Sequence, residues 1–405
     1  MSDTSRVNAS TVFGAADRAG DYTEEDTALA TASPPRQTET PAPALLDPTS
    51  ATDPDSDAQG TLPPPAASAV ARERDRASTS VLFGTSAAGL AAAARTSNPA
   101  KASTGFRGVL ASLGLPIGPG PAEVVERGRV DVRITHETTV RQATWTRAVS
   151  ILVNNPKGGT GKTPTALLLG GVLAAIRGGS VAILEVSDDP GALNFRAEGD
   201  PQLGLGELVR DITHVRTAGR LAGYTAPQTS FASVIGSTGR RERLTGDSVI
   251  AVTSVIDEFY GIRVMDSGNV TTSSAFQGAV SVSDVLVIPV MNAGDSVLEA
   301  IQLLEELRDA GGASAELANR AIAIRLTDGR PENEAVRQEV ERLLTQAGVI
   351  ALHEIPYDSH IAERGPLTLD RLNPATRDAF TAAAASVVRS LQSAVSSAPS
   401  QTRKA

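Results

Sequence analysis

Short apolar runs alternate with longer amphipathic stretches along the chain from residue 148 onward. The apolar runs lie at residues 148–153, 181–184, 262–265, 285–288, 321–324 and 349–355. Runs of this length that are rich in β-branched residues are typical of buried strands. The amphipathic stretches predict helices at residues 166–176, 205–212, 248–260, 295–309, 332–347 and 376–395. Strands that alternate with helices in this way predict an α/β fold, a doubly wound and mostly parallel sheet with helices on both faces.

The first hundred residues do not follow this pattern. Residues 1–103 contain few bulky apolar side chains, and nine prolines lie between Pro34 and Pro65. Because such a segment cannot bury enough apolar surface to offset its ordering entropy, we expect a disordered N-terminal extension. Two apolar segments, residues 10–15 and 80–85, interrupt it. They are either docking motifs for a protein partner or chance matches in an Ala- and Ser-rich background.

Residues 104–147 are predicted to form a transition segment between the extension and the α/β domain. A short helix is expected at residues 106–113, before a run of Pro and Gly. Residues 130–134 read Val-Asp-Val-Arg-Ile, and this alternation predicts an edge strand. The α/β domain itself is assigned to residues 148–397, and residues 398–405 to a loose tail.

Composition and charge narrow the range of functions. The chain has no cysteine, so disulfide and thiolate chemistry are excluded. Its net charge of −9 argues against a globally basic nucleic-acid binder, although a local basic face stays open. No apolar run reaches the roughly 18 residues of a membrane span, and the Met-Ser-Asp-Thr start lacks the features of a secretory signal. The last predicted helix is Ala- and Ser-rich, so we expect a cytoplasmic protein without direct membrane insertion.

The candidate chemistry is concentrated in a glycine-rich segment, residues 154–165, which reads Asn-Asn-Pro-Lys-Gly-Gly-Thr-Gly-Lys-Thr-Pro-Thr. It lies between the first predicted strand and the following helix. Glycines allow the backbone to approach a phosphate, and a helix N-terminus adds partial positive charge. The pattern predicts that Lys162 contacts the β- and γ-phosphates of ATP and that Thr163 binds Mg²⁺. The backbone around the phosphates would come from Gly158, Gly159, Thr160, Gly161 and Pro164.

Two residues near this segment modify the prediction. Asp266 directly follows the predicted strand at residues 262–265, and an acid at this place is expected to bind Mg²⁺ together with Thr163. Pro164 lies in the first turn of the predicted helix, where proline is tolerated. Since proline has no N–H to donate to a phosphate, we expect Pro164 to reduce the affinity for nucleotide.

Residues 157–163, Lys-Gly-Gly-Thr-Gly-Lys-Thr, resemble the deviant Walker A motif of the ParA/MinD family of P-loop ATPases. The resemblance extends over about residues 148–395. It implies a homodimer that sandwiches two ATP molecules, in which Lys157 of one protomer contacts the nucleotide bound by the other. Lys157 and Lys162 are therefore the catalytic lysines that the resemblance implies.

The resemblance also implies roles for two turns that follow predicted strands. The Asp-Ser-Gly turn that ends at Gly268 is similar to the family's switch II, so the Gly268 N–H is expected to contact the γ-phosphate. Residues 185–191, Glu-Val-Ser-Asp-Asp-Pro-Gly, resemble switch I, whose second acid orients the attacking water. The register stays open, because one alignment places Glu185 at the first acid and another places Asp189 at the second. We take Asp189 as the first candidate and Asp188 as the second.

An adenine site is also implied, formed by Thr327, Asp328 and Pro356, which follow two further predicted strands. Within the family, several details are most similar to actinobacterial MinD-like ATPases of type VII (ESX) secretion loci. They include Gly-Ala-Leu-Asn-Phe-Arg at residues 191–196 and Ile-Pro-Tyr-Asp-Ser-His at residues 355–360.

Three functions are open from the sequence. The first is an ATP-binding and hydrolysing dimerisation switch that positions or regulates a cellular assembly. The second is a partition ATPase whose ATP-bound dimer binds DNA non-specifically. The third is a non-hydrolysing ATP-binding scaffold that recruits partners through its N-terminal tail. The basic face of the second hypothesis would come from Arg325, Arg330, Arg337, Arg342, Arg364, Arg371 and Arg377.

Overall fold

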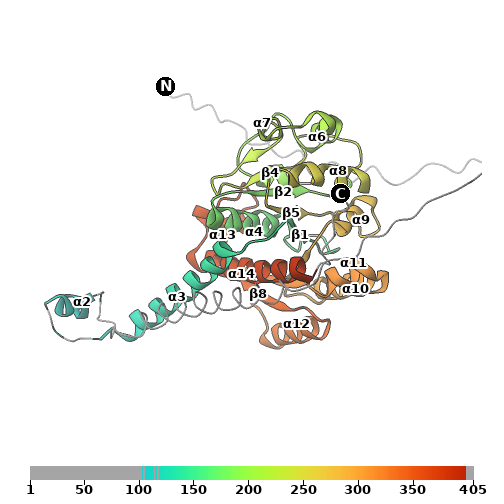
Figure 1. Cartoon of the computed structure of the whole chain (residues 1–405). Helices are drawn as coiled ribbons and strands as arrows, with labels where there is room; N and C mark the ends of the chain where they lie inside the picture. Colours follow the sequence, from blue (N-terminus) through green and yellow to red (C-terminus); the bar gives the residue numbers. More distant parts are fainter. Residues whose placement is uncertain (1–102, 104, 114, 116–117, 398–405) are drawn as a thin grey trace, which may run out of the picture. The chain divides into compact units, whose positions relative to one another are not determined.

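The computed structural model describes residue 103, residues 105–113, residue 115 and residues 118–397. Nearly all of the predicted N-terminal extension, with its two apolar segments, and the loose C-terminal tail lie outside these residues. The described part contains an eight-stranded sheet with helices on both faces (Figure 1). This confirms the predicted α/β fold with a mostly parallel sheet.

The order of the strands places β1 in the middle of the sheet. The strands are β1 (Val149–Val153), β2 (Val181–Glu185), β3 (Ala226–Pro227), β4 (Ser233–Ile235), β5 (Ile262–Asp266), β6 (Val285–Met291), β7 (Ile322–Leu326) and β8 (Ala351–Ile355). They are arranged as β3-β4-β2-β5-β1-β6-β7-β8, and each neighbouring pair is parallel except β3 with β4. The chain thus builds outward from β1 on both sides, and open sheets of this kind bind ligands at the carboxyl ends of the strands where the strand order reverses.

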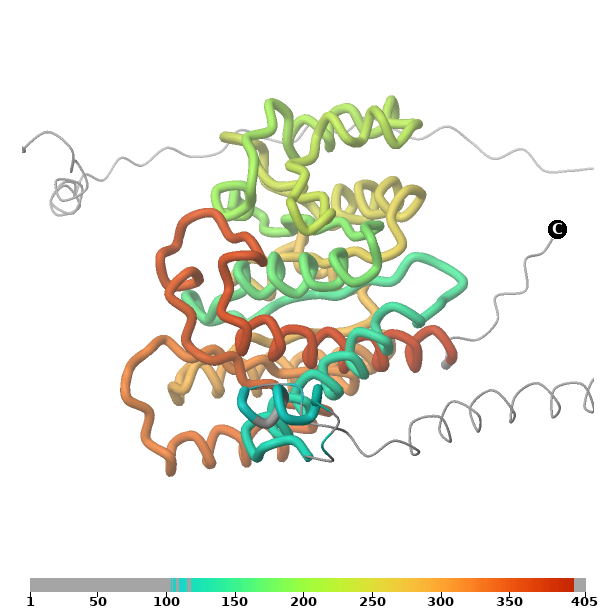
Figure 2. Tube along the Cα trace, turned by 90° about the vertical axis from the view of Figure 1, so that its left-hand side faces the viewer, coloured from blue at the N-terminus to red at the C-terminus, as the bar shows by residue number. Residues whose placement is uncertain are grey.

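Helices cover the sheet in two layers. They are α2 (Gly105–Ser112), α3 (Pro121–Gln142), α4 (Lys162–Arg177), α5 (Leu193–Arg196), α6 (Leu205–Asp211), α7 (Ala218–Ala222), α8 (Gly246–Asp257), α9 (Ser274–Ser281), α10 (Gly294–Ala310), α11 (Gly312–Ala318), α12 (Glu334–Gln346), α13 (Ser359–Ala362) and α14 (Pro374–Ser397), with 3₁₀ turns at Ile212–His214 and Leu369–Arg371. One face packs against α4, α14 and the end of α3, and Figure 2 shows α14 in red beside them. The other face packs against α6 and α8–α12.

Burial on both faces explains why the strands read as apolar runs. Every residue of β1 is buried. Ile151 and Val153 pack with the layer that contains α4, whereas Leu152 packs with the opposite layer. Successive side chains of a strand point to opposite faces, so a strand in the middle of two helical layers needs an apolar side chain at nearly every position.

The edge strand predicted at residues 130–134 is wrong, because these residues lie inside α3. This helix begins at Pro121, a position at which the missing N–H costs nothing. An ion pair one turn apart, between Arg127 and Glu123 at 2.6 Å, supports the helix. Its C-terminal end enters the core through the buried Val140. Five alternating residues are too few to distinguish a strand from one side of a long helix.

Two strands lie where the apolar pattern predicts none. β3 and β4 are only two and three residues long, which is too short to produce a periodic signal. They extend the sheet beyond β2, and the chain that follows them returns toward the carboxyl ends of the central strands. No helix in the described part combines the length and the apolar character needed to cross a membrane.

Candidate functional site

A loop at residues 154–161 joins β1 to α4 at the carboxyl end of the central strand, the edge at which open parallel sheets bind ligands. Gly159 (φ +79°) and Gly161 (φ +89°) adopt the left-handed backbone conformation, which favours glycine. The loop therefore turns directly into the N-terminus of α4, where backbone N–H groups lack helical partners. This is the backbone arrangement that binds phosphate groups.

Gly158, Thr160 and Pro164 complete the same turn. Thr160 is buried, and Pro164 lies in the first turn of α4. The proline does not interrupt the helix, because the Thr165 N–H donates to the Gly161 carbonyl at 2.9 Å. All the loop residues selected from the sequence are thus in one short turn.

The ammonium group of Lys162 is held above the loop by oxygen atoms. Its Nζ donates to the Asn155 carbonyl at 2.7 Å, to the Lys157 carbonyl at 3.1 Å and to the side-chain oxygen of Asn269. Burial lowers the pKa of Lys162 to about 8, since the charged form is poorly solvated there. A nearby anion would stabilise that charge, so the geometry favours a negatively charged ligand.

Thr163 and Asp266 meet beside the same turn. The Thr163 hydroxyl donates to Asp266 Oδ2 at 2.7 Å, and Asp266 Oδ1 is buried with no hydrogen-bond partner in the described part. Burial, with a smaller contribution from the neighbouring Glu185 carboxylate, raises the pKa of Asp266 to about 7. A hydroxyl and an unpaired carboxylate oxygen are suitable ligands for Mg²⁺ when substrate phosphates and water complete the shell. The residues present therefore fit this ion.

Replacing Asp266 with asparagine is expected to stabilise the nucleotide-free protein. The carboxyl group has a pKa of about 7 in the folded protein and 3.8 as a free side chain, so the folded protein binds more protons than the unfolded chain between these values. Stability is therefore lost as pH rises from about 4 to about 7, on the order of 4 kcal/mol in total. The advantage of Asp266→Asn should grow over that window and stay constant above it.

Thermal or urea unfolding in EDTA at pH 5, 7 and 8 measures this difference. The exposed Asp247 provides a matched control, since Asp247→Asn removes a solvated carboxylate and should change stability by less than about 1 kcal/mol. If Asp266→Asn is less stable than the unsubstituted protein at pH 8, the carboxylate is not a buried, unpaired charge.

Lys157 points away from its own loop. Its Nζ forms an ion pair with Asp295 Oδ2 at 2.8 Å, next to the start of α10, and both side chains are largely exposed. The hydrogen bond to Asp295 raises the pKa of Lys157. A lysine that contacts a second protomer must first leave this carboxylate, and its exposure permits that movement.

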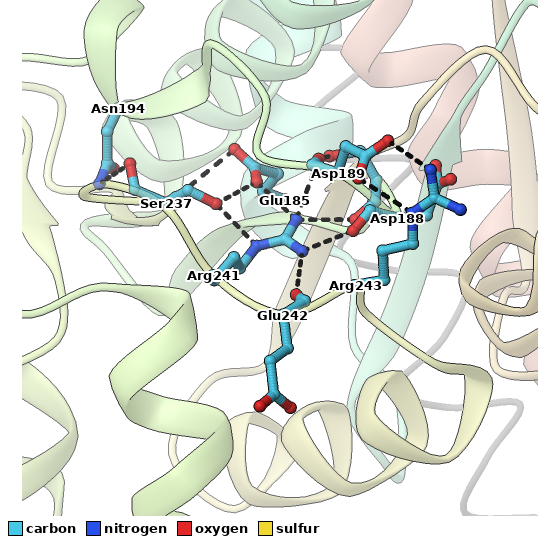
Figure 3. A network of polar contacts seen from close by, with 9 residues as sticks. Glu185, Asp188, Asp189, Asn194, Ser237, Arg241, Glu242 and Arg243 are labelled. Carbon is cyan, nitrogen blue, oxygen red and sulfur yellow. Dashed lines mark hydrogen bonds and ion pairs between the residues drawn. The ribbon is translucent and has the colours of Figure 1, made fainter.

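The turn after β5 is tied to the glycine-rich loop. The Asn154 side chain donates to the Gly268 carbonyl at 3.0 Å. A Cβ added to Gly268 would lie 3.5 Å from Asp188 Oδ1, so this carboxylate reaches the turn. Asp189 instead forms an exposed ion pair with Arg243 at 3.2 Å (Figure 3). The two candidate acids therefore point to different surroundings, and Asp188 is the one beside Gly268.

The residues expected around an adenine base come together at the ends of β7 and β8. Thr327 and Asp328 follow β7, and Pro356 follows β8, its neighbour in the sheet. Leu326, which precedes Thr327, would lie 3.2 Å from a Cβ added to Gly161. The end of β7, after which Thr327 and Asp328 lie, thus approaches the glycine-rich loop.

A buried polar network beside β2 has no signal in the sequence. Arg241 Nη2 donates to Glu185 Oε1 at 3.0 Å, and Arg241 Nε donates to Ser237 Oγ at 2.8 Å (Figure 3). The side chains of Arg241 and Glu185 are only 4% and 1% exposed. Glu185 pairs in register with Asp266 across β2 and β5. The arginine and the acid are 56 positions apart, and no motif connects them.

The chain is similar to known proteins in sequence and in fold. A family model described as the CobQ/CobB/MinD/ParA nucleotide binding domain matches residues 151–366. No curated protein sequence matches the chain significantly. Among solved structures, the chain is similar to a ParA family ATPase from Chlorobium tepidum TLS, with 16% identity, a TM-score of 0.50, and 59% of this chain and 98% of that chain covered.

Two further solved structures are similar at lower scores. One is the MinC:MinD cell division protein complex of Aquifex aeolicus, with 19% identity, a TM-score of 0.46 and coverage of 60% and 96%. The other is the cell division ATPase MinD of Pyrococcus furiosus, with 17% identity, a TM-score of 0.45 and coverage of 60% and 99%. The matched family segment covers more than half of the chain and contains the glycine-rich loop and Asp266. The chain belongs to the CobQ/CobB/MinD/ParA family of nucleotide-binding domains.

Proposed function

We propose that this protein binds ATP with Mg²⁺, dimerises around it and hydrolyses it, and so acts as a switch that positions or regulates a cellular assembly. The observation that carries the proposal is the meeting of three groups at the start of α4. They are the ammonium of Lys162, the Thr163 hydroxyl and the unpaired Asp266 oxygen. A cation and a fitting pair of Mg²⁺ ligands beside a phosphate-binding turn favour a nucleoside triphosphate.

The proposed roles combine the observed contacts of Lys162, Thr163 and Asp266 with the resemblance to the ParA/MinD family. Lys162 and the N–H groups of the loop bind the β- and γ-phosphates, and the Gly268 N–H contacts the γ-phosphate. Thr163 and Asp266 hold Mg²⁺, which neutralises charge on the transferring phosphoryl group when it is bound. An acid of the 185–189 segment orients the attacking water. Thr327, Asp328 and Pro356 surround the base.

Dimerisation supplies the switch. Lys157 leaves Asp295 and contacts the nucleotide of the second protomer, so the dimer is favoured only when ATP is bound. A ligand shifts an equilibrium only through its differential affinity for the two states, and this lysine provides such a difference. The motifs at residues 191–196 and 355–360 suggest a type VII secretion apparatus as the first assembly to test. The N-terminal extension is the proposed recruiting segment.

A DNA partition role is less well supported. Six of the seven arginines of the suggested basic face form ion pairs with acidic side chains, and these are Arg325, Arg330, Arg337, Arg342, Arg371 and Arg377. Paired charges contribute little to the release of counterions that drives binding to phosphate backbones. A measurement of phosphate release is enough to distinguish the third hypothesis, a non-hydrolysing scaffold, from the proposed switch.

The test is the oligomeric state by light scattering with ATP and Mg²⁺, with ADP, and without nucleotide, alongside phosphate release from the same samples. A dimer that forms only with ATP, together with slow phosphate release, is the expected result. A dimer without phosphate release would support the scaffold. A protein whose mass does not respond to nucleotide would contradict the proposal.

The switch I acids can be distinguished by paired substitutions. Asp188→Ala is expected to lower kcat by about 10²-fold or more, because its carboxylate faces the Gly268 turn. Asp189→Ala removes an exposed ion pair and is expected to lower kcat by no more than about threefold. Phosphate release at saturating ATP measures both. The reverse order would restore Asp189, the acid favoured by sequence, as the water-orienting group.

A further inference from the structure

We propose that Arg241 is a positioning residue that fixes the 185–189 segment in the geometry needed for hydrolysis. This inference rests on the proposed ATPase function. The evidence is the set of bonds that Arg241 makes, none of which can be derived from the glycine-rich motif (Figure 3).

Arg241 binds three consecutive backbone carbonyls of this segment. Nη2 donates to the Ser187 carbonyl at 2.8 Å and to the Asp189 carbonyl at 3.1 Å, while Nη1 donates to the Asp188 carbonyl at 2.6 Å. The Leu244 N–H also donates to the Asp188 carbonyl, at 2.9 Å. The short loop that carries Arg241 thus holds the backbone on either side of the carboxylate that faces Gly268.

The acid Glu185 and the hydroxyl of Ser237 lock the guanidinium group. The two side chains bond to each other, and each bonds to Arg241. A buried carboxylate is costly unless it is paired, so Glu185 keeps the arginine in place. Each guanidinium nitrogen donates to at least one acceptor. Only the planar guanidinium group of arginine has enough donors, in the right directions, to bond to all these acceptors at once.

The network lies beside the candidate site without entering its phosphate-binding part. Glu185 is level with Asp266 in the sheet, and the hydrogen bonds of Arg241 all go to residues 185–189, 237 and 242. Arg241 therefore acts on the placement of the water-orienting acid rather than on the binding of ATP. A misplacement of about 1 Å in such a group lowers a rate by about 10²-fold.

The test is Arg241→Lys, which keeps a positive charge beside Glu185 but cannot donate hydrogen bonds to all three backbone carbonyls. The matched control is Arg240→Lys, the same substitution at the exposed neighbouring position. Arg241→Lys is expected to lower kcat by about 10- to 100-fold, while the dissociation constant for ATP, measured with a fluorescent ATP analogue, stays within about twofold. Arg240→Lys should match the unsubstituted protein in both measurements.

Hydrogen–deuterium exchange gives a readout that does not need hydrolysis. Peptides that cover residues 185–191 and 241–246 should exchange at least about fivefold faster in Arg241→Lys, with residues 150–165 unchanged. Ser237→Ala, which removes only one bond to the arginine, should produce a smaller effect in the same direction.

Two results would overturn the positioning role. One is unchanged exchange in residues 185–191, which decides the question even if the unsubstituted protein does not hydrolyse ATP. The other is a loss of kcat that is matched by an equal loss of ATP affinity, since that would indicate damage to the whole site. Absence of hydrolysis by the unsubstituted protein would instead overturn the proposed ATPase function and leave the exchange result for Arg241 standing.

Discussion

Replacing Lys162 with alanine is expected to weaken ATP binding by about 10²- to 10⁴-fold. The Lys162 ammonium is the only cation of the glycine-rich loop that is buried in the structure as described, and it is the group proposed to face the β- and γ-phosphates. Two charge-assisted hydrogen bonds of roughly 1.5–3 kcal/mol each account for this range. Binding of a fluorescent ATP analogue measures it, with circular dichroism to verify that the variant is folded.

The pH dependence of the same measurement adds a second check. Burial lowers the pKa of Lys162 to about 8 before nucleotide binds, so the lysine is charged below that pH and increasingly neutral above it. ATP affinity should therefore fall as pH rises through about 8 in the unsubstituted protein, and this decline should be absent in Lys162→Ala. Unchanged ATP affinity in the variant would refute the assignment of the glycine-rich loop.

Lys157→Ala should spare ATP binding by the monomer and weaken the ATP-bound dimer by about 10- to 100-fold. The reason is that Lys157 is directed out of its own loop and is exposed, which suits a contact with a second protomer. One charge-assisted bond of roughly 1.5–3 kcal/mol sets the size of the effect. Sedimentation or light scattering over a series of protein concentrations, with ATP and Mg²⁺ present, measures the dimer dissociation constant.

Asp295→Asn provides the matched control for this experiment. It breaks the same ion pair but leaves the lysine in place, so the dimer should be at least as strong as that of the unsubstituted protein. If Asp295→Asn weakens the dimer as much as Lys157→Ala does, the ion pair itself matters and the lysine does not act across the interface. The two lysine variants also control for each other, because one should lose binding and the other only association.

Local features explain why much of the fold could be predicted. Buried parallel strands such as β1 and β6 must be apolar at nearly every position, so they are visible as runs in the sequence. The glycine-rich loop is equally visible, because phosphate binding needs glycines, a lysine and a hydroxyl within one short turn. The prediction of a strand at residues 130–134 was wrong because five alternating residues are too short a pattern to reveal the 22-residue helix that contains them.

The sequence by itself determined the α/β class and the position of the glycine-rich loop, and it singled out Lys162, Thr163 and Asp266, whose side chains lie beside that loop in the structure. Each of these depends on residues that are close along the chain, or on the rule that open parallel sheets bind ligands at the carboxyl ends of their strands. Only the tertiary structure decided that Lys157 pairs with Asp295 and that Asp188 rather than Asp189 faces Gly268. The hydrogen bonds between Arg241 and the 185–189 segment are likewise visible only in the tertiary structure. Such contacts join residues far apart in sequence, and their geometry depends on how β2, β5 and the loop after β4 pack, which no local pattern encodes.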